Sequence, residues 1–231
     1  VEWVEQYHMP YKKVVMPDGM IAPDVPYVGG MHLKKARKEI IRLLEEKGLL
    51  LKTEPITHTV SAHERCGTSV EIIPSKQWYI DILSMKDELL AAGDKINWYP
   101  ASMKNRYVNW VENLKWDWCI SRQRYFGVPF PVWYCRKCGK AYFADLDSLP
   151  VNPLETEYHG TCECGCTEFI PESAVLDTWA TSSITPQINR RAAAKYGVDG
   201  DFAPMSMRTQ AHEIIRTWAF YTIAKSLYHT G

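Results

Sequence analysis

The chain has 231 residues, of which 46% are apolar, and its 27 Lys and Arg balance 27 Asp and Glu. This length holds one large domain or two small ones, and the apolar fraction is enough for a normal core. A net charge of zero provides no general basic field for nucleic acid, so any RNA contact must be local. No apolar run reaches the roughly 18–20 residues that span a bilayer, and no signal peptide begins the chain, which favours a cytoplasmic protein without a membrane partner. Val1-Glu2-Trp3 carries no start signal, so we expect a segment of a longer protein.

The hydrophobic pattern predicts a succession of short elements. In chain order they are a loop (1–31), an amphipathic helix (32–48), a strand–turn–strand (57–73), two helices (77–92 and 102–114), an extended segment (127–133), a cysteine-bearing insert (134–170), a strand (205–209) and a long helix (212–228). Gly48 is a suitable cap for the first helix, and Gly67 marks the turn between the first two strands. Pro129 and Pro131 exclude helix from the extended segment. These elements predict a mixed helix and strand fold of the α/β type.

Five of the seven cysteines form two tight clusters, which favours a metal in a reduced compartment over a disulfide framework. Cys135 and Cys138 form a C-x-x-C-G turn, and a C-x-C-G-C run follows after 23 residues. Two such turns can present four thiolates to zinc in a tetrahedron. In the second turn we expect Cys164 first and Cys162 next, with Cys166 as the alternative to Cys162. Four thiolates close a site, so the zinc is expected to be structural and not catalytic. The two remaining cysteines stand alone and are predicted to be buried small hydrophobes: Cys66 and Cys119.

A strand that runs into a helix over residues 205–228 is half of a mononucleotide-binding unit, in which ligands lie near the start of the helix. Glu213 in the first helical turn can accept hydrogen bonds from a ribose, or it can simply stabilise the helix dipole. Ile214 and Trp218 are four residues apart, so they share a helix face and can line a small apolar pocket or belong to the ordinary core.

A dense aromatic and basic stretch lies between these regions, with Trp118, Arg122 and Arg124 at its centre. Aromatic rings stack on bases and arginines bind phosphates, so this stretch can hold a single-stranded RNA end. The alternative is an interdomain core in which the arginines form ion pairs with Glu112 or Asp117.

Three segments together resemble the valyl-tRNA synthetase family, in its archaeal-like form. They are W-C-I-S-R-Q-R-Y-F-G at 118–127, V-L-D-T-W-A-T-S-S-I-T-P at 175–186 and H-E-I-I-R-T-W-A-F at 212–220. His63-Glu64-Arg65-Cys66-Gly67-Thr68 and Gln77-Trp78 are similar to the point where that family returns from its editing insertion. The resemblance covers nearly the whole chain.

The resemblance implies roles for individual residues. The valine pocket is expected to contain Trp179, Ile214, Trp218, Asp177 and Thr178. The adenosine, or the amino group of valine, is expected beside Glu213 and His212, and the tRNA 3′ end beside Arg122, Arg124 and Trp118.

The resemblance also implies a domain plan. It expects the C-terminal tail of the editing insertion (1–74), a return into the catalytic core (75–133), a zinc ribbon (134–170) and the second half of a class I Rossmann-like catalytic domain (171–231). The whole protein is expected to be a monomer that uses ATP, Mg²⁺, valine and tRNA(Val), with structural Zn²⁺. The family's two ATP-binding motifs and the core of its editing domain are absent from this chain, so we expect the segment alone to be inactive.

Two other interpretations remain open at this stage. Isoleucyl enzymes share W-x-I-S-R-Q-R but usually carry D-Q-x-R-G-W in the final helix, where this chain has Ile214, Ile215 and Thr217 before Trp218. A non-catalytic zinc ribbon that binds tRNA is the rival from another functional class. Each interpretation predicts a different response to valine, which separates them by experiment.

Overall fold

The computed structural model describes residues 2–198, 200, 202 and 204–231, so Val1 and the parts of the predicted final segment at positions 199, 201 and 203 lie outside the description. The chain divides into two compact units, Val1–Lys76 and Gln77–Gly231. The first unit ends close to residue 74, where the predicted first segment ends. Within the described part of the chain, every helix is too short or too polar to cross a bilayer.

The first unit contains α1 (Glu2–Gln6) and α2 (Leu33–Glu46), and α2 confirms the helix predicted over 32–48. The ring Nδ1 of His32 accepts a hydrogen bond from the Lys34 backbone N–H and so caps the start of α2. Its end is a glycine terminus, because Gly48 takes a φ of +63° that favours glycine. A small core beside α2 is formed by Ile21, Val28 and Ala36.

The strand–turn–strand predicted over 57–73 is reduced to its turn. Gly67 has a φ of +64°, as a turn requires, but the flanking residues form only one isolated bridge, between Ala62 and Ser69. The prediction of two strands is therefore wrong. A lone hairpin is marginally stable unless a third strand or a helix covers it, and Ile72 in this segment is 87% exposed.

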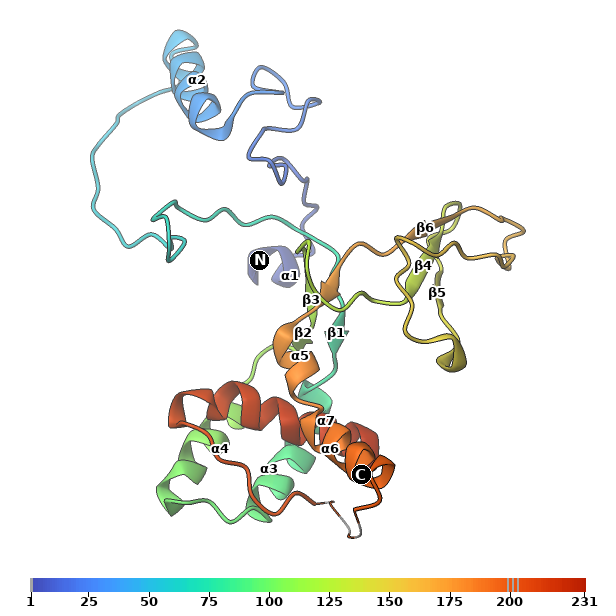
Figure 1. The fold of residues 1–231 in the computed structure, drawn as a ribbon. Helices are drawn as coiled ribbons and strands as arrows, with labels where there is room; N and C mark the ends of the chain where they lie inside the picture. Colours follow the sequence, from blue (N-terminus) through green and yellow to red (C-terminus); the bar gives the residue numbers. More distant parts are fainter. Residues whose placement is uncertain (1, 199, 201, 203) are drawn as a thin grey trace. The chain divides into compact units, whose positions relative to one another are not determined.

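The second unit has three small antiparallel sheets (Figure 1). The strand pairs and the triplet are β1 (Tyr79–Ile80) with β2 (Trp118–Cys119), β3 (Ser121–Arg122) with β7 (Val175–Leu176), and β5 (Ala141–Phe143), β4 (Val132–Cys135) and β6 (Phe169–Pro171) in that order. All pairs among these described strands are antiparallel. A fold of mixed helix and strand is confirmed, but these strands form no parallel sheet of the Rossmann-like kind.

Helices supply most of the second unit's core. They are α3 (Lys86–Asp94), α4 (Lys104–Glu112), α5 (Thr178–Ser182), α6 (Thr185–Lys195) and α7 (Phe220–Thr230), with 3-10 turns at Leu83–Met85, Ala101–Met103, Leu146–Ser148 and His212–Ile214 and a π-helical turn at Ile215–Ala219. The largest buried cluster joins α3, α4, α7 and the π-helical turn through Leu89, Tyr107, Val111, Ile215 and Phe220. Trp118 and Trp179 pack into or against this same cluster.

The helix predicted over 102–114 is confirmed by α4 and the turn before it, whereas the helix over 77–92 is right only in its second half. Residues 79–80 pair as β1 with Trp118–Cys119, so tertiary pairing overrides the helical pattern there. The helix begins only after Asp81, whose carboxylate accepts the backbone N–H and the hydroxyl of Ser84.

The C-terminal predictions need two corrections. Residues 205–209 form no strand, since they have no ladder partner, and the chain enters the final helix from irregular backbone. The helix predicted over 212–228 is helical throughout but irregular, because 3-10 and π-helical turns precede α7. Hydroxyls of Thr217 and Thr222 donate to the carbonyls of Ile214 and Trp218 in this stretch, a type of contact that bends helices.

Candidate functional site

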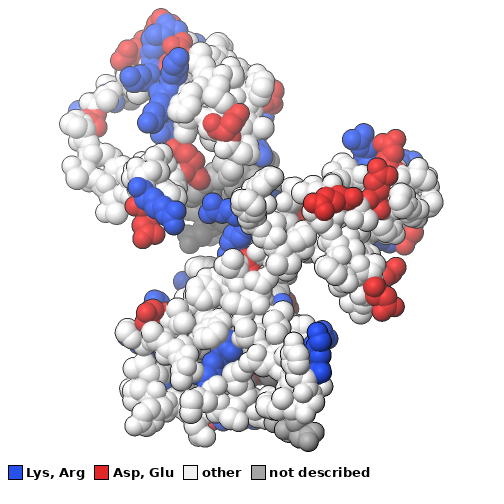
Figure 2. Space-filling model, viewed as in Figure 1, with Lys and Arg blue, Asp and Glu red and all other residues white. Residues whose placement is uncertain are grey.

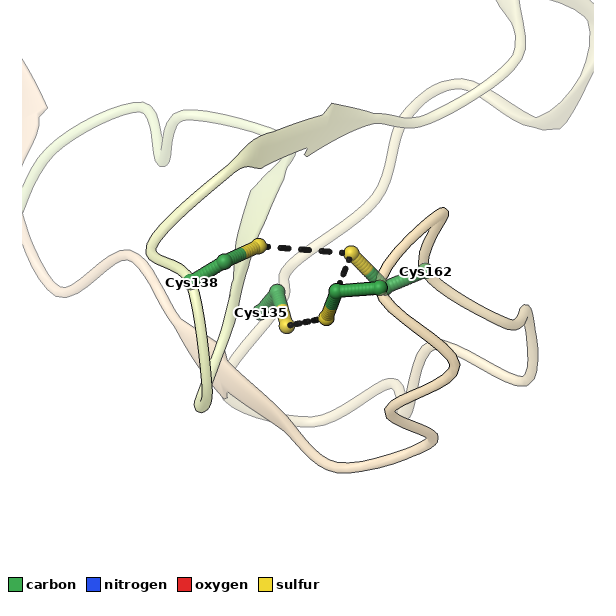
Figure 3. A group of neighbouring side chains, drawn as sticks. Cys135, Cys138 and Cys162 are labelled. Atoms are coloured by element: carbon green, nitrogen blue, oxygen red, sulfur yellow. Dashed lines mark hydrogen bonds between the residues drawn. The ribbon is translucent and has the colours of Figure 1, made fainter.

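Four cysteines of the ribbon formed by β4, β5 and β6 meet at one point, as the spacing predicted. The Sγ atoms of Cys135, Cys138, Cys162 and Cys164 all lie within 4.8 Å of one another. Figure 3 shows the sulfurs of Cys135, Cys138 and Cys162 turned toward a common centre. The contacts are 3.5 Å between Cys135 and Cys164, and 3.4 Å from Cys162 to each of Cys138 and Cys164.

Two matching turns create this arrangement. Gly139 and Gly165, each directly after a cysteine, have φ values of +73° and +80° that favour glycine. The N–H of Gly139 donates to the carbonyl of Cys135, and the N–H of Gly165 donates to the carbonyl of Cys162. Each turn thus points a pair of thiols from opposite sides into the same space.

The thiol cluster fits a tetrahedral metal. Zn–S bonds of about 2.3 Å place sulfurs about 3.8 Å apart in a tetrahedron, close to the spacing found here. The pKa of Cys135 is lowered to about 6: burial acts against its thiolate, but backbone N–H groups of Cys138 and Lys137 and neighbouring thiols outweigh burial. The choice of Cys162 over Cys166 is supported, because the Cys166 thiol lies outside the cluster and contacts the carbonyl of Glu168.

The isolated cysteines do not both follow the prediction. Cys66 is exposed, so its description as a buried hydrophobe is wrong, and its Sγ lies 3.4 Å from Nδ1 of His63. Cys119 is half-buried beside Gln77.

Asp177, Thr178 and Trp179 lie at the start of α5, directly after β7. Asp177 is 5% exposed and its backbone N–H donates to the carbonyl of Ile120, which ties α5 to the W-C-I-S-R segment. One oxygen of its carboxylate lies 3.4 Å from the guanidinium of Arg122, and the other has no hydrogen-bond partner among the described residues. Thr178 is exposed, whereas Trp179 is half-buried against the main core.

Ile214 and Trp218 belong to the irregular start of the final helix. The indole N–H of Trp218 donates to the carbonyl of Ser182 at the end of α5, over 3.3 Å. This bond joins the second and third recognised segments, so Trp179 and Trp218 lie on neighbouring elements. Ile214 is half-buried, while His212 and Glu213 are exposed with Nδ1 and a carboxylate oxygen 3.7 Å apart.

The residues of the aromatic and basic stretch differ in how far they are buried. Trp118 is 6% exposed and its ring stacks on Tyr221, with centroids 3.8 Å apart and planes within 7°. With one face covered by Tyr221 and little of the side chain exposed, this ring offers little area on which a base of the tRNA end could stack. Arg122 donates to the carbonyls of Cys119 and Ser121 and faces Asp177, while Arg124 is exposed.

Sequence patterns did not reveal a polar junction at Glu172. One oxygen of this carboxylate accepts hydrogen bonds from the indole of Trp78 and the hydroxyl of Tyr134, and the other accepts the N–H of Ala174. Burial acts to raise the pKa of Glu172, but these bonds outweigh it and hold the pKa below its usual value. Trp78 and Tyr134 are 94 and 38 residues away from Glu172 in sequence, so no local signal for these two bonds was available.

Two cavities found among the described residues are not lined by Trp179, Ile214 or Trp218. One of about 330 Å³ is lined by aromatic residues including Tyr79, Trp110 and Trp118, with Asp117 and Arg122. The other, of about 310 Å³, lies beside Asp81, Lys225 and Tyr228. Charges of both signs are scattered over the face shown in Figure 2, in keeping with a net charge of zero.

Comparisons with known proteins identify the family. The model of the tRNA synthetases of class I (I, L, M and V) matches residues 30–231. Valine–tRNA ligases of Picrophilus torridus, Thermoplasma acidophilum and Rickettsia rickettsii are 50%, 46% and 43% identical over 94%, 97% and 99% of this chain. The chain spans only 27–29% of the length of these relatives. With its segments at 118–127, 175–186 and 212–220 joined in one unit, the chain belongs to the class I tRNA synthetases and is similar to valine–tRNA ligases.

Proposed function

We propose that the protein containing this chain is a valine–tRNA ligase. It would activate valine with ATP and Mg²⁺ to valyl-adenylate and transfer the valyl group to tRNA(Val). The observation that carries this proposal is the identity of 43–50% to valine–tRNA ligases across 94–99% of the chain. Electrostatic stabilisation of the transferring phosphate is usually the largest part of such catalysis, and this chain has neither ATP signature motif, so we expect the chain alone to be inactive.

Within the proposed enzyme, Trp179, Ile214 and Trp218 would line the pocket for the valine side chain. The hydrogen bond from Trp218 to Ser182 supports this assignment, because it joins the elements that carry the two indoles. Asp177 and Thr178 would shape the floor of the pocket. Such an apolar pocket excludes isoleucine by size but rejects threonine, which has nearly the shape of valine, only about 100-fold, a value already known for this type of enzyme. An editing site is therefore expected in the whole protein.

Polar groups around this pocket would hold the rest of the substrates. The exposed carboxylate of Glu213 can accept hydrogen bonds from a ribose or from the amino group of valine, with His212 beside it. Arg122 and Arg124 would meet the phosphates of the tRNA 3′ end, and the exposure of Arg124 supports its part. In this plan residues 1–74 are the tail of an editing insertion, and residues 171–231 are the second half of the catalytic domain.

We also propose that the four clustered cysteines bind Zn²⁺. Cys135, Cys138, Cys162 and Cys164 offer four soft thiolate ligands at tetrahedral spacing, the donor set typical of structural zinc. The metal would fix the ribbon, which is too small to be held by its own core.

The test is ATP–pyrophosphate exchange by the full-length protein with valine, isoleucine and threonine compared under the same conditions. The proposal expects strong exchange with valine and weak exchange with isoleucine. Preference for isoleucine would move the protein to the isoleucine enzymes, and no exchange with any amino acid would favour a tRNA-binding module.

A further inference from the structure

Arg208 holds one face of Trp218. The central carbon of its guanidinium lies 3.6 Å from the centroid of the indole, which is a close stacking contact. The guanidinium is fixed in turn at 3.1 Å by the hydroxyl of Thr185, the first residue of α6. Since the indole N–H bonds to Ser182, Trp218 is restrained both on its face and at its edge.

This arginine is a poor choice for stability alone. Burial lowers the pKa of Arg208, and no ion pair among the described residues includes it. Its Nε and Nη2 are buried and have no hydrogen-bond acceptor in the described part of the chain. A half-buried charge without an opposite charge is costly where its nitrogens are out of reach of water, and an apolar side chain would cover the indole without that cost. The stacking contact with Trp218 is therefore the interaction that best explains an arginine at this position.

We propose that Arg208 is a positioning residue that fixes the plane of Trp218 and thereby the size limit of the amino-acid pocket. This inference rests on the proposed function, in which Trp218 lines that pocket. Arginine suits the task because its guanidinium is flat and stacks on an aromatic ring, whereas the ammonium of lysine is a compact, strongly hydrated point charge. Free rotation of the indole would open the wall and weaken both valine binding and the exclusion of isoleucine.

The experiment compares Arg208→Met, Arg208→Lys and Arg216→Met in the full-length protein. Arg216 is a matched control, since its exposed guanidinium lies 5.9 Å from the ring of another tryptophan, Trp110. KM and kcat for valine and for isoleucine are measured by pyrophosphate exchange, with thermal unfolding as a check on the fold.

For Arg208→Met we expect KM for valine to rise about tenfold, with a smaller change in kcat, and the preference for valine over isoleucine to fall severalfold. Arg208→Lys should lie between this variant and the wild type, and it carries the test if Arg208→Met does not fold. Arg216→Met should match the wild type.

The outcomes separate the two proposals. If the wild type uses valine and both folded Arg208 variants keep its KM and its valine preference, the positioning role is wrong while the proposed function stands. An equal loss of kcat for both amino acids with unchanged KM would also overturn it, because that pattern reports a general structural defect. A wild type without valine-dependent exchange overturns the proposed function and this inference together.

Discussion

An alanine in place of Gly93 in α3 would have two opposing effects on the stability of the fold. Replacing a helical glycine with alanine normally stabilises a protein by up to about 1 kcal/mol. A Cβ at Gly93, however, would lie 2.4 Å from Cε1 and 2.8 Å from Cδ1 of Tyr107. Carbon atoms pack best at about 3.5–4.0 Å, so the ring would have to move by about 1 Å.

The ring of Tyr107 has no room for that movement. It is fully buried, its hydroxyl donates to the carbonyl of Leu89, and it contacts the rings of Trp98 and Phe220. Overpacking of this kind costs about 1–3 kcal/mol, and the severity of the clash places it in the upper part of that range. We therefore expect Gly93→Ala to reduce the free energy of unfolding by a net ~1–2 kcal/mol after the helical gain.

The assay is urea unfolding monitored by circular dichroism. Gly93→Ala is measured alone, in combination with each of two substitutions of Tyr107, and beside one control variant. Tyr107→Phe keeps the ring, so Gly93→Ala should cost the same there, whereas Tyr107→Leu removes the ring edge and should reduce the cost. Ala91→Gly, at an exposed position of the same helix, measures the helical preference alone. Neutral or increased stability in Gly93→Ala, or an equal cost in the Tyr107→Leu background, would refute the argument.

Three further predictions concern the polar sites. Cys164→Ser should remove bound zinc, measured by elemental analysis of the purified chain, whereas Cys166→Ser should retain it; loss of zinc in both variants contradicts the assigned ligands. Glu172→Gln should lower the free energy of unfolding at neutral pH. Because the folded pKa of Glu172 is lowered, this loss of stability relative to wild type should be complete above the unfolded pKa of about 4.5 and should disappear as pH falls through the folded pKa. A loss of stability that persists at low pH in urea unfolding argues against this role. Asp177→Asn should reduce the free energy of unfolding by about 1–2 kcal/mol, because it removes the charge that faces Arg122. In an Arg122→Met background the same substitution should reduce the free energy of unfolding by less, measured in the same assay.

Local chemistry was sufficient to predict some elements. Helix α2 follows from its apolar spacing and Gly48, and the cluster of four thiols follows from two glycine turns that each contain a cysteine pair. In these cases the decisive contacts are close in sequence, apart from the meeting of the two turns.

Long-range pairing explains most of the errors. Residues 79–80 have a pattern compatible with helix, and only their distant partners at 118–119 make them a strand. Trp118 shows the same limit for function, because its stacking on Tyr221 removes an aromatic face that the sequence offers to RNA. The contact between Arg208 and Trp218 could not be predicted either, because nothing in the sequence around Arg208 indicates it.

The ribbon and the recognised segments are joined through Trp78. Cys135 ends β4, and the residue before it, Tyr134, donates to Glu172 just beyond the end of β6. The same carboxylate accepts the indole N–H of Trp78, whose backbone N–H donates to the hydroxyl of Ser121 in the W-C-I-S-R segment. A metal bound at the end of β4 would therefore also restrain the strand that carries Tyr134, and through Glu172 it would order the start of the segment beside the proposed pocket. The proposed zinc would have only structural ligands, yet its loss should be transmitted along these three hydrogen bonds to the residues that hold Asp177.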